Sequence, residues 1–273
     1  MARRVKRFGQ HFLEPTWVRK VVDVINPQPD EIFIEIGPGG GALTAPLAER
    51  SASVTAVEID RDLAAGLRRR APANVAVVEA NILDIDLAAL VKERVALAGT
   101  GVRTVRIAGN IPYNISSPIL FRLIHLYRAG VGITDATLML QLEVAERLAA
   151  GPGSRDYGVL SILASLYAEI EQVLTLPPGA FRPPPKVWSA VVRMRFRPVG
   201  VELEDEAVFE GLVKSIFTQR RKTLSNALKP FATSRGTAAA AAIAAADLDG
   251  RRRPETLNLA ELARLAAVLS RPL

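Results

Sequence analysis

Short runs rich in β-branched residues alternate with amphipathic segments over the first half of this 273-residue chain. The alternation predicts strands at Ile32–Ile36, Val54–Val57 and Val75–Val78, with helices at Ala42–Arg50 and Asp62–Arg70 between them. Parallel strands need a crossover of about a dozen residues, usually a helix, and such crossovers are right-handed. The pattern therefore predicts an α/β fold with a doubly wound parallel sheet.

The alternation continues along the chain and then changes character. The next expected elements are a helix near Leu87–Ala98, a strand at 102–108, a helix at 117–129, a strand at Ala136–Leu140 and a helix from about Tyr157. Two later segments, Ile170–Leu176 and Val187–Phe196, have strand character. They are expected to form an antiparallel hairpin at the edge of the sheet.

The two ends of the chain differ from this body. Residues 1–14 are expected to form an arm, and a helix then runs from Glu14-Pro15-Thr16 to about Asn26. Strand patterns disappear after Arg197, and helices follow, including the alanine run Ala238–Ala246. We therefore expect one domain over 1–197, with the arm at 1–14, and a small all-helical domain over 198–273.

Composition limits the chemistry and the partners. The chain has no cysteine and two histidines, so a thiolate nucleophile is excluded and no metal site is expected. The net charge of +7 divides into +5 over 1–20, −5 over 21–181, +5 over 182–229 and +2 over 230–273. Basic segments on either side of a mildly acidic body are typical of a protein that binds a polyanion and has a separate small-molecule pocket.

The N-terminal sequence carries no recognisable targeting signal. No apolar run of signal-peptide length follows the basic start, and no stretch of about 18 apolar residues occurs. We expect a cytoplasmic protein with no membrane partner. No coiled-coil pattern is evident, so a monomer is expected.

Asn110-Ile111-Pro112-Tyr113 is placed where the fourth strand gives way to a loop. Ligands bind at the carboxyl ends of strands in open α/β sheets. The Asn110 amide oxygen and the Ile111 carbonyl can each accept one N–H of an exocyclic amine, and Tyr113 can stack on the ring that carries it. The four residues suit an amino-bearing nucleobase, although taken alone they also fit an ordinary turn.

A second site is expected at the first strand-to-helix turn. Residues 35–42 read Glu-Ile-Gly-Pro-Gly-Gly-Gly-Ala, and small residues there let a ligand approach the backbone. Glu58 ends the second strand, where its carboxylate can bind a ribose diol. The loop also fits the loose dinucleotide fingerprint, so a nicotinamide oxidoreductase is a rival interpretation. Asn81 ends the third strand, where its amide can bond the adenine edge of an adenosine cofactor. Together with the amine-accepting tetrapeptide, it favours S-adenosylmethionine.

Five motifs spaced along the chain together indicate one protein family. The chain resembles the ribosomal RNA adenine dimethyltransferase family, and within it the bacterial small-subunit branch, in the segments 9–13 (GQHFL), 35–44 (EIGPGGGALT), 110–114 (NIPYN), 181–189 (FRPPPKVWS) and 220–224 (RRKTL). The resemblance implies a Rossmann-like class I S-adenosylmethionine-dependent methyltransferase domain with a helical C-terminal domain. It also implies dimethylation of two adjacent adenines in the 3′-terminal hairpin of 16S rRNA, within an immature 30S subunit.

The resemblance also assigns residues to roles. The residues expected to line the cofactor are His11, Leu13, Gly37, Gly39, Glu58, Asn81 and Asn110. The residues expected to act on the target adenine are Asn110, Ile111, Pro112 and Tyr113, with Phe181 stacking on its other face. His11 stands where the family commonly has Asn, and Asn81 where it commonly has Asp.

The helical domain is expected to contact RNA through Arg220, Arg221 and Lys222, a basic cluster directly before Thr223, which is the expected N-cap of the next helix. Trp17 and Trp188 are expected to be packing residues. Two alternatives stay open. A 23S rRNA methyltransferase of the macrolide-resistance type shares the same core, and a largely non-catalytic 30S assembly factor would bind without needing the chemistry.

Overall fold

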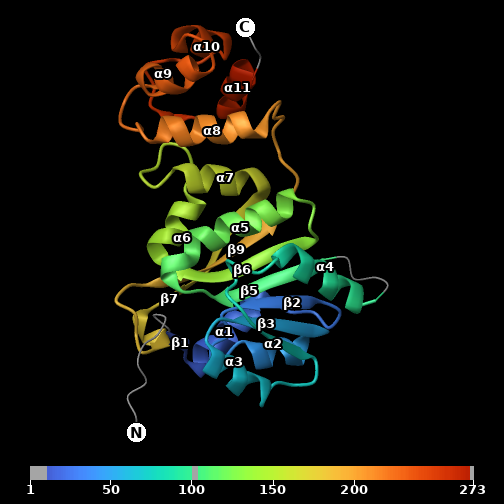
Figure 1. Ribbon diagram of the computed structural model, residues 1–273. Coiled ribbons are helices and arrows are strands. Elements are labelled where there is room, and N and C mark those ends of the chain that lie inside the picture. The colour runs from blue at the N-terminus through green and yellow to red at the C-terminus, as the bar shows by residue number, and fades with distance from the viewer. Residues whose placement is uncertain (1–10, 100–103, 271–273) are drawn as a thin grey trace. The chain divides into compact units, whose positions relative to one another are not determined.

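The computed structural model describes residues 11–99 and 104–270 (Figure 1). The chain folds into two compact units. The sheet unit comprises the chain up to Ala145 together with Glu169–Phe196, and the helical unit comprises Glu146–Ala168 together with the chain from Arg197 onward. Within the described residues, no helix is long and apolar enough to cross a membrane.

The sheet unit has a seven-stranded sheet in the order β4-β3-β2-β5-β6-β9-β7. Its strands are β2 (Ile32–Ile36), β3 (Ser53–Glu58), β4 (Val75–Glu79), β5 (Val105–Asn110), β6 (Ile133–Gln141), β7 (Ala168–Leu176) and β9 (Ser189–Phe196). The first five are parallel, and β9 is antiparallel to β6. A separate two-stranded sheet pairs β1 (Phe12–Leu13) with β8 (Phe181–Arg182).

Helices cover both faces of this sheet (Figure 1). The helices of the sheet unit are α1 (Pro15–Ile25), α2 (Thr44–Arg50), α3 (Arg61–Arg68), α4 (Leu87–Leu97) and α5 (Ser116–Arg128), and α6 (Leu142–Ala149) begins directly after β6. The crossovers through α2 and α3 run to one edge of the sheet, and those through α4 and α5 run to the other. The strand order therefore reverses between β2 and β5, which is where a ligand crevice opens.

A glycine allows β2 and β5 to pair closely at this reversal. Ile36 and Gly109 are register partners. A Cβ atom at Gly109 would lie 2.5 Å from the Ile36 carbonyl oxygen, closer than any side chain tolerates. The absence of a side chain at this position keeps the ends of the two strands in contact.

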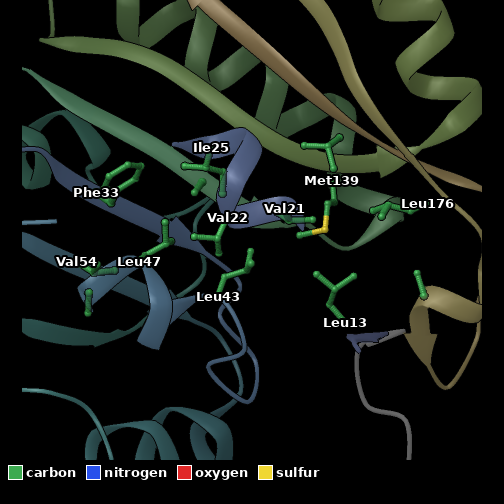
Figure 2. Packing of buried hydrophobic residues seen from close by; sticks show 14 of the residues in the cluster. Leu13, Val21, Val22, Ile25, Phe33, Leu43, Leu47, Val54, Met139 and Leu176 are labelled. Atoms are coloured by element: carbon green, nitrogen blue, oxygen red, sulfur yellow. The ribbon is translucent and has the colours of Figure 1, made fainter. Parts of the chain in front are cut away.

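An apolar cluster fixes α1 and α2 on the sheet (Figure 2). Val21, Val22 and Ile25 of α1 and Leu47 of α2 are each at most 1% exposed. They pack with Phe33 of β2, and the same cluster extends to Leu13, Met139 and Leu176. Full burial of such side chains stabilises a fold by about 1.5–3 kcal/mol each. The cluster therefore anchors β1 to the sheet unit.

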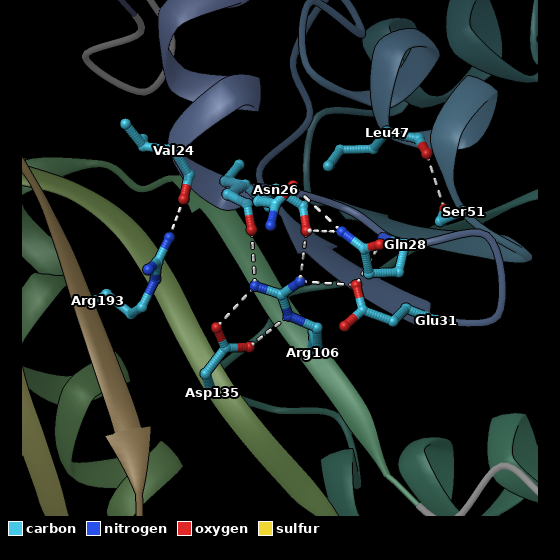
Figure 3. A network of polar contacts seen from close by, with 10 residues as sticks. Val24, Asn26, Gln28, Glu31, Leu47, Ser51, Arg106, Asp135 and Arg193 are labelled. Atoms are coloured by element: carbon cyan, nitrogen blue, oxygen red, sulfur yellow. Dashed lines mark hydrogen bonds and ion pairs between the residues drawn. The ribbon is translucent and has the colours of Figure 1, made fainter.

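A polar network secures the opposite end of the sheet (Figure 3). The Arg106 guanidinium donates to both carboxylate oxygens of Asp135, at 2.8 and 2.9 Å, and to Glu31 at 2.7 Å. It also donates to the backbone carbonyls of Ile25 and Asn26. The network ties the starts of β5 and β6 to the end of α1, at the sheet end away from the predicted site.

The helical unit contains α7 (Val159–Tyr167), α8 (Glu206–Phe217), α9 (Leu224–Ser234), α10 (Ala239–Ala245) and α11 (Leu259–Ser270). Side chains from residues 146–168 contact the part of this unit that follows Arg197. The Tyr157 hydroxyl donates to the Leu257 carbonyl at 3.1 Å, and the Tyr157 ring lies edge-on to Phe217. The helical unit thus takes residues 146–168 together with the chain from Arg197 onward, whereas the sequence placed 146–168 in the domain over 1–197; the division into a methyltransferase domain over 1–197 and an RNA-binding domain over 198–273 stays a prediction.

Most predicted elements lie within a few residues of their observed bounds. The expected hairpin segments are neighbouring strands, β7 and β9, with β7 at the sheet edge. One element was missed, and one strand bound was wrong. The helix α6 was not expected, and Val187 and Trp188 precede β9 instead of lying in it, since the strand begins at Ser189. Residues 1–10 of the arm expected over 1–14 lie outside the described residues, and the described part of the arm contains β1.

Candidate active site

A cavity of about 700 Å³ opens in the sheet unit at the carboxyl ends of the central parallel strands. Its lining comes from 11–13, 35–39, 42–43, 57–59, 80–83 and 110–115. Ten residues predicted from the sequence line it, namely His11, Leu13, Gly37, Gly39, Glu58, Asn81, Asn110, Ile111, Pro112 and Tyr113. The parallel strands bring eight of these residues together because their carboxyl ends meet at one edge of the sheet, and the segment at β1 adds His11 and Leu13.

Glu58 holds the glycine loop from the end of β3. Its side chain is 3% exposed, and it accepts hydrogen bonds from the Gly39 and Asp60 backbone N–H groups, both at 2.9 Å. Burial raises the pKa of Glu58, and these two hydrogen bonds oppose the rise. Each carboxylate oxygen has a further acceptor site. Glu58 can therefore accept from a ribose diol while it orders the loop.

Gly39 needs to be glycine for two reasons. Its φ of +57° lies in the left-handed region, and an added Cβ atom would lie 3.1 Å from the Phe12 ring. The glycine loop consequently packs on β1, a contact that no sequence pattern suggested. Phe12 thus links the arm to the glycine loop that is predicted to bind the cofactor.

Glu35 is a second buried carboxyl group behind the loop. It is 1% exposed and accepts a 2.6 Å hydrogen bond from the Thr44 hydroxyl. Burial raises the pKa of Glu35 to about 7, the Thr44 hydrogen bond opposes the rise, and the nearby Glu58 adds to it. No pattern in the sequence indicated a carboxyl group that keeps part of its protonation at neutral pH here.

This raised pKa makes stability depend on pH. Because native Glu35 holds its proton more tightly than the unfolded chain, its contribution to the free energy of unfolding is complete below pH 4.5 and is lost as the pH rises through about 7. Glu35→Gln keeps an acceptor for Thr44 and removes this loss. Between pH 5 and pH 8, the variant is expected to gain up to about 3 kcal/mol relative to the unchanged protein in urea unfolding. Parallel pH profiles would contradict the assignment.

The Asn81 side chain is engaged in its own turn. Its amide oxygen accepts from the Leu83 N–H at 3.1 Å, and its amide nitrogen donates to Asp84 at 2.8 Å. These bonds shape the wall formed by Ile82 and Leu83, two cavity residues that the sequence reasoning missed. Their position directly after the third strand was the available signal. A contact of Asn81 with adenine stays a prediction, for which the second amide N–H remains a donor.

The backbone of His11 orients the Asn110 amide. Its Nδ2 donates to the His11 backbone carbonyl at 2.7 Å. The bond directs the amide so that Oδ1 is the atom left to accept from a ligand. Ile111 is 1% exposed, and Pro112 after it has no N–H to compete for acceptors. Asn110 and the Ile111 carbonyl therefore form an acceptor pair at the end of β5.

Two contacts fix the Tyr113 ring. The His11 ring stacks on it, with centroids 5.8 Å apart and planes inclined by 22°. The Tyr113 hydroxyl shares a 2.6 Å hydrogen bond with the Ser189 hydroxyl at the start of β9, and burial raises the pKa of Tyr113. Tyr113 is therefore neutral at physiological pH and is held in one orientation.

Phe181 is not brought to the cavity. Its side chain is 0% exposed and belongs to the apolar cluster of α1 and α2. The pairing of Leu13 with Phe181 between β1 and β8 places it there. The predicted stacking of Phe181 on adenine is not supported by this arrangement, because the ring has no free face.

The basic cluster lies in the turn between α8 and α9, before the N-cap Thr223. Arg221 and Lys222 are exposed. Arg220 instead pairs with Glu255 at 3.0 Å and donates to the Arg155 carbonyl at 2.6 Å. Arg220 thus connects the 150s loop to the later turns of the helical unit, which leaves fewer of its N–H groups for a phosphate.

The fold and cavity define a class. A sheet of this order, with a glycine loop after β2 and an acidic residue ending β3, forms an S-adenosylmethionine-dependent methyltransferase domain of the Rossmann-like type. The site fits that cofactor, because Glu58 has acceptor sites for a ribose diol and the glycine loop leaves backbone approachable.

Comparison with known proteins identifies the family. The model of the ribosomal RNA adenine dimethylase family matches residues 1–264, and the chain belongs to this family. It is 45% identical over 266 residues to ribosomal RNA small subunit methyltransferase A of Methylibium petroleiphilum, covering 97% of this chain and 96% of that protein.

Solved structures agree. The 23S rRNA methyltransferase ErmE aligns with a TM-score of 0.67 and 27% identity, covering 95% of this chain and 100% of that one. A dimethyladenosine transferase from Plasmodium falciparum has the same fold, with a TM-score of 0.75 at 23% identity over 93% and 96% of the two chains.

Proposed function

We propose that this enzyme transfers methyl groups from S-adenosylmethionine to the 6-amino groups of two adjacent adenines in the 3′-terminal hairpin of 16S rRNA. The acceptor pair of Asn110 and the Ile111 carbonyl, beside the fixed ring of Tyr113, is the observation that carries the proposal. An exocyclic amine has two N–H groups, and this pair offers one acceptor for each. The relatives named small subunit methyltransferase A support 16S rRNA as the substrate.

In the proposed mechanism, the residues of this chain align the amine and exclude water. The sulfonium of the bound cofactor supplies an activated methyl group. Asn110 Oδ1 and the Ile111 carbonyl accept the two amine hydrogens, which directs the nitrogen lone pair toward the methyl group. Alignment of this kind can lower a barrier by about 7–11 kcal/mol. The proton of the product amine leaves to solvent, so no general base is required.

The tetrapeptide permits a second methylation. Ile111 is buried, and the Tyr113 ring is held by its hydrogen bond with Ser189, so the tetrapeptide has no other bulky side chain to exclude a methylated amine. A monomethylated amine retains one N–H for Asn110 or the Ile111 carbonyl. Dimethyladenosine is therefore the expected product.

The 23S rRNA alternative is supported less well. The relatives named for the small subunit are 42–45% identical to this chain, while ErmE is 27% identical. We further propose that the enzyme acts as a cytoplasmic monomer on an immature 30S subunit. An assembly factor that works without chemistry would not need the acceptor pair.

The test is methyl transfer from labelled S-adenosylmethionine to 30S subunits that lack the modification, with unmodified 23S rRNA alongside. Digestion and mass analysis should give dimethyladenosine in 16S rRNA alone. Label in 23S rRNA would favour the resistance-type enzyme. Binding to 30S subunits with no label in either RNA would favour the assembly factor.

The exposed cluster in the helical unit leads to a salt prediction. Arg221 and Lys222 have exposed side chains for phosphates, whereas Arg220 is held by Glu255. Arg221→Ala with Lys222→Ala is expected to reduce the slope of log affinity against log salt, for 30S subunits, by about 2. Arg251→Ala, which removes an exposed arginine paired with Asp249, is the matched control. An unchanged slope in the double variant would exclude phosphate contacts there.

A further inference from the structure

The segment 183–188 borders the mouth of the cavity at both of its ends. The Pro183 carbonyl lies 2.6 Å from His11 Nδ1. At the other end, Ser189 shares its hydrogen bond with the Tyr113 hydroxyl. His11 and Tyr113 both line the cavity. The segment between Pro183 and Ser189 is therefore fixed at the rim.

This rim segment ends in an exposed tryptophan. Trp188 is 51% exposed and its neighbour Val187 is 43% exposed, while Ser189 is fully buried. The Trp188 carbonyl accepts from the Leu142 N–H at 2.9 Å, so the backbone is anchored while the indole faces solvent. The expectation that Trp188 is a packing residue was wrong, because β9 begins one residue later and Trp188 does not enter the core.

The surroundings of Trp188 suit a nucleotide. Lys186 is exposed two residues earlier, and residues 182–189 contain no acidic side chain. Arg182, directly before this segment, is paired with Glu14 at 2.8 Å, whereas Lys186 is exposed. An exposed aromatic ring beside a cation is the combination that holds unpaired bases of single-stranded nucleic acid.

We propose that Trp188 stacks on the base of the nucleotide next to the target adenine, with Lys186 beside its phosphate. The inference rests on the proposed function, in which the target is one of two adjacent adenines. Two neighbouring bases cannot share the acceptor pair of Asn110 and Ile111, so the neighbour must lie outside the cavity while its partner reacts. Trp188 provides an aromatic surface at the rim where that base would emerge.

Fluorescence gives a direct test, because the chain has only two tryptophans. In Trp17→Phe, Trp188 is the sole indole, and a 3′-terminal hairpin RNA of 16S sequence is expected to quench its emission. In Trp188→Phe, the remaining Trp17 packs against the core and should respond little. Equal responses from the two variants would overturn the proposal.

Kinetics give the second test. Trp188→Ala is expected to lower kcat/KM on unmodified 30S subunits by about tenfold, and Trp188→Phe should restore most of the loss. Leu97→Ala, at another exposed apolar residue of the sheet unit, is the matched control and should leave the rate unchanged. Thermal unfolding of each variant verifies the fold.

A modified RNA substrate tests which group Trp188 contacts. On the hairpin RNA, replacing the neighbouring nucleotide with an abasic one should weaken binding to the unchanged protein and leave Trp188→Ala unaffected. Losses that add independently would overturn the stacking proposal, because Trp188 would then contact a different part of the RNA. If the unchanged enzyme methylates no 30S subunit, the proposed function fails, whereas normal methylation by Trp188→Ala refutes only this inference.

Discussion

Asn110→Ala is expected to reduce methyl transfer to 30S subunits by about 1,000-fold, the loss typical of removing one group that stabilises a transition state. The variant lacks Oδ1, which we propose accepts one hydrogen of the reacting amine. Glu58 and the glycine loop are untouched, so the dissociation constant for S-adenosylmethionine should change by less than about tenfold. Single-turnover transfer and equilibrium cofactor titration separate these two quantities.

Asn114→Ala is the matched control for this variant. Asn114 lines the same cavity and is exposed, but it follows the tetrapeptide and has no expected role with the amine. Its transfer rate should stay within a few-fold of the unchanged enzyme. Full activity in Asn110→Ala would refute the acceptor mechanism. A lost affinity for S-adenosylmethionine would show that Asn110 acts mainly by binding the cofactor, and not by binding the reacting amine.

Gly109→Ala is expected to destabilise the protein by about 3 kcal/mol or more, because the new Cβ atom would meet the Ile36 backbone 2.5 Å away. Neither strand can shift without breaking the pairing of β2 with β5. That pairing also positions the glycine loop relative to Asn110, so the surviving folded protein should have reduced activity. Urea unfolding with a parallel transfer assay measures both effects.

Gly40, in the glycine loop that follows β2, offers a matched control for Gly109→Ala. Gly40 has ordinary backbone dihedrals, and a Cβ atom there meets nothing within 4 Å. Gly40→Ala should change the free energy of unfolding by less than about 0.5 kcal/mol. If the two variants were equally stable, the close approach of β2 and β5 would not be a requirement of the fold.

Local pattern was sufficient for the elements of the sheet and for most of the cavity. Strand and helix periodicity predicted the alternation from Ile32 to Leu140, and the crossover rule then places all parallel carboxyl ends at one edge. For that reason, polar residues that end strands, such as Glu58 and Asn110, were found without any contact information. The resemblance added His11 and Leu13, which no periodicity would select.

The sequence alone determined the order of the elements, the glycine loop and the acceptor tetrapeptide, because each depends on residues close together in the chain. The tertiary structure decided that Phe181 is buried, that Trp188 is exposed, and that Arg220 pairs with Glu255. It also supplied the bond from Ser189 to Tyr113, 76 residues apart. Burial and pairing of a side chain depend on which distant segments pack against it, and neighbouring residues do not carry that information.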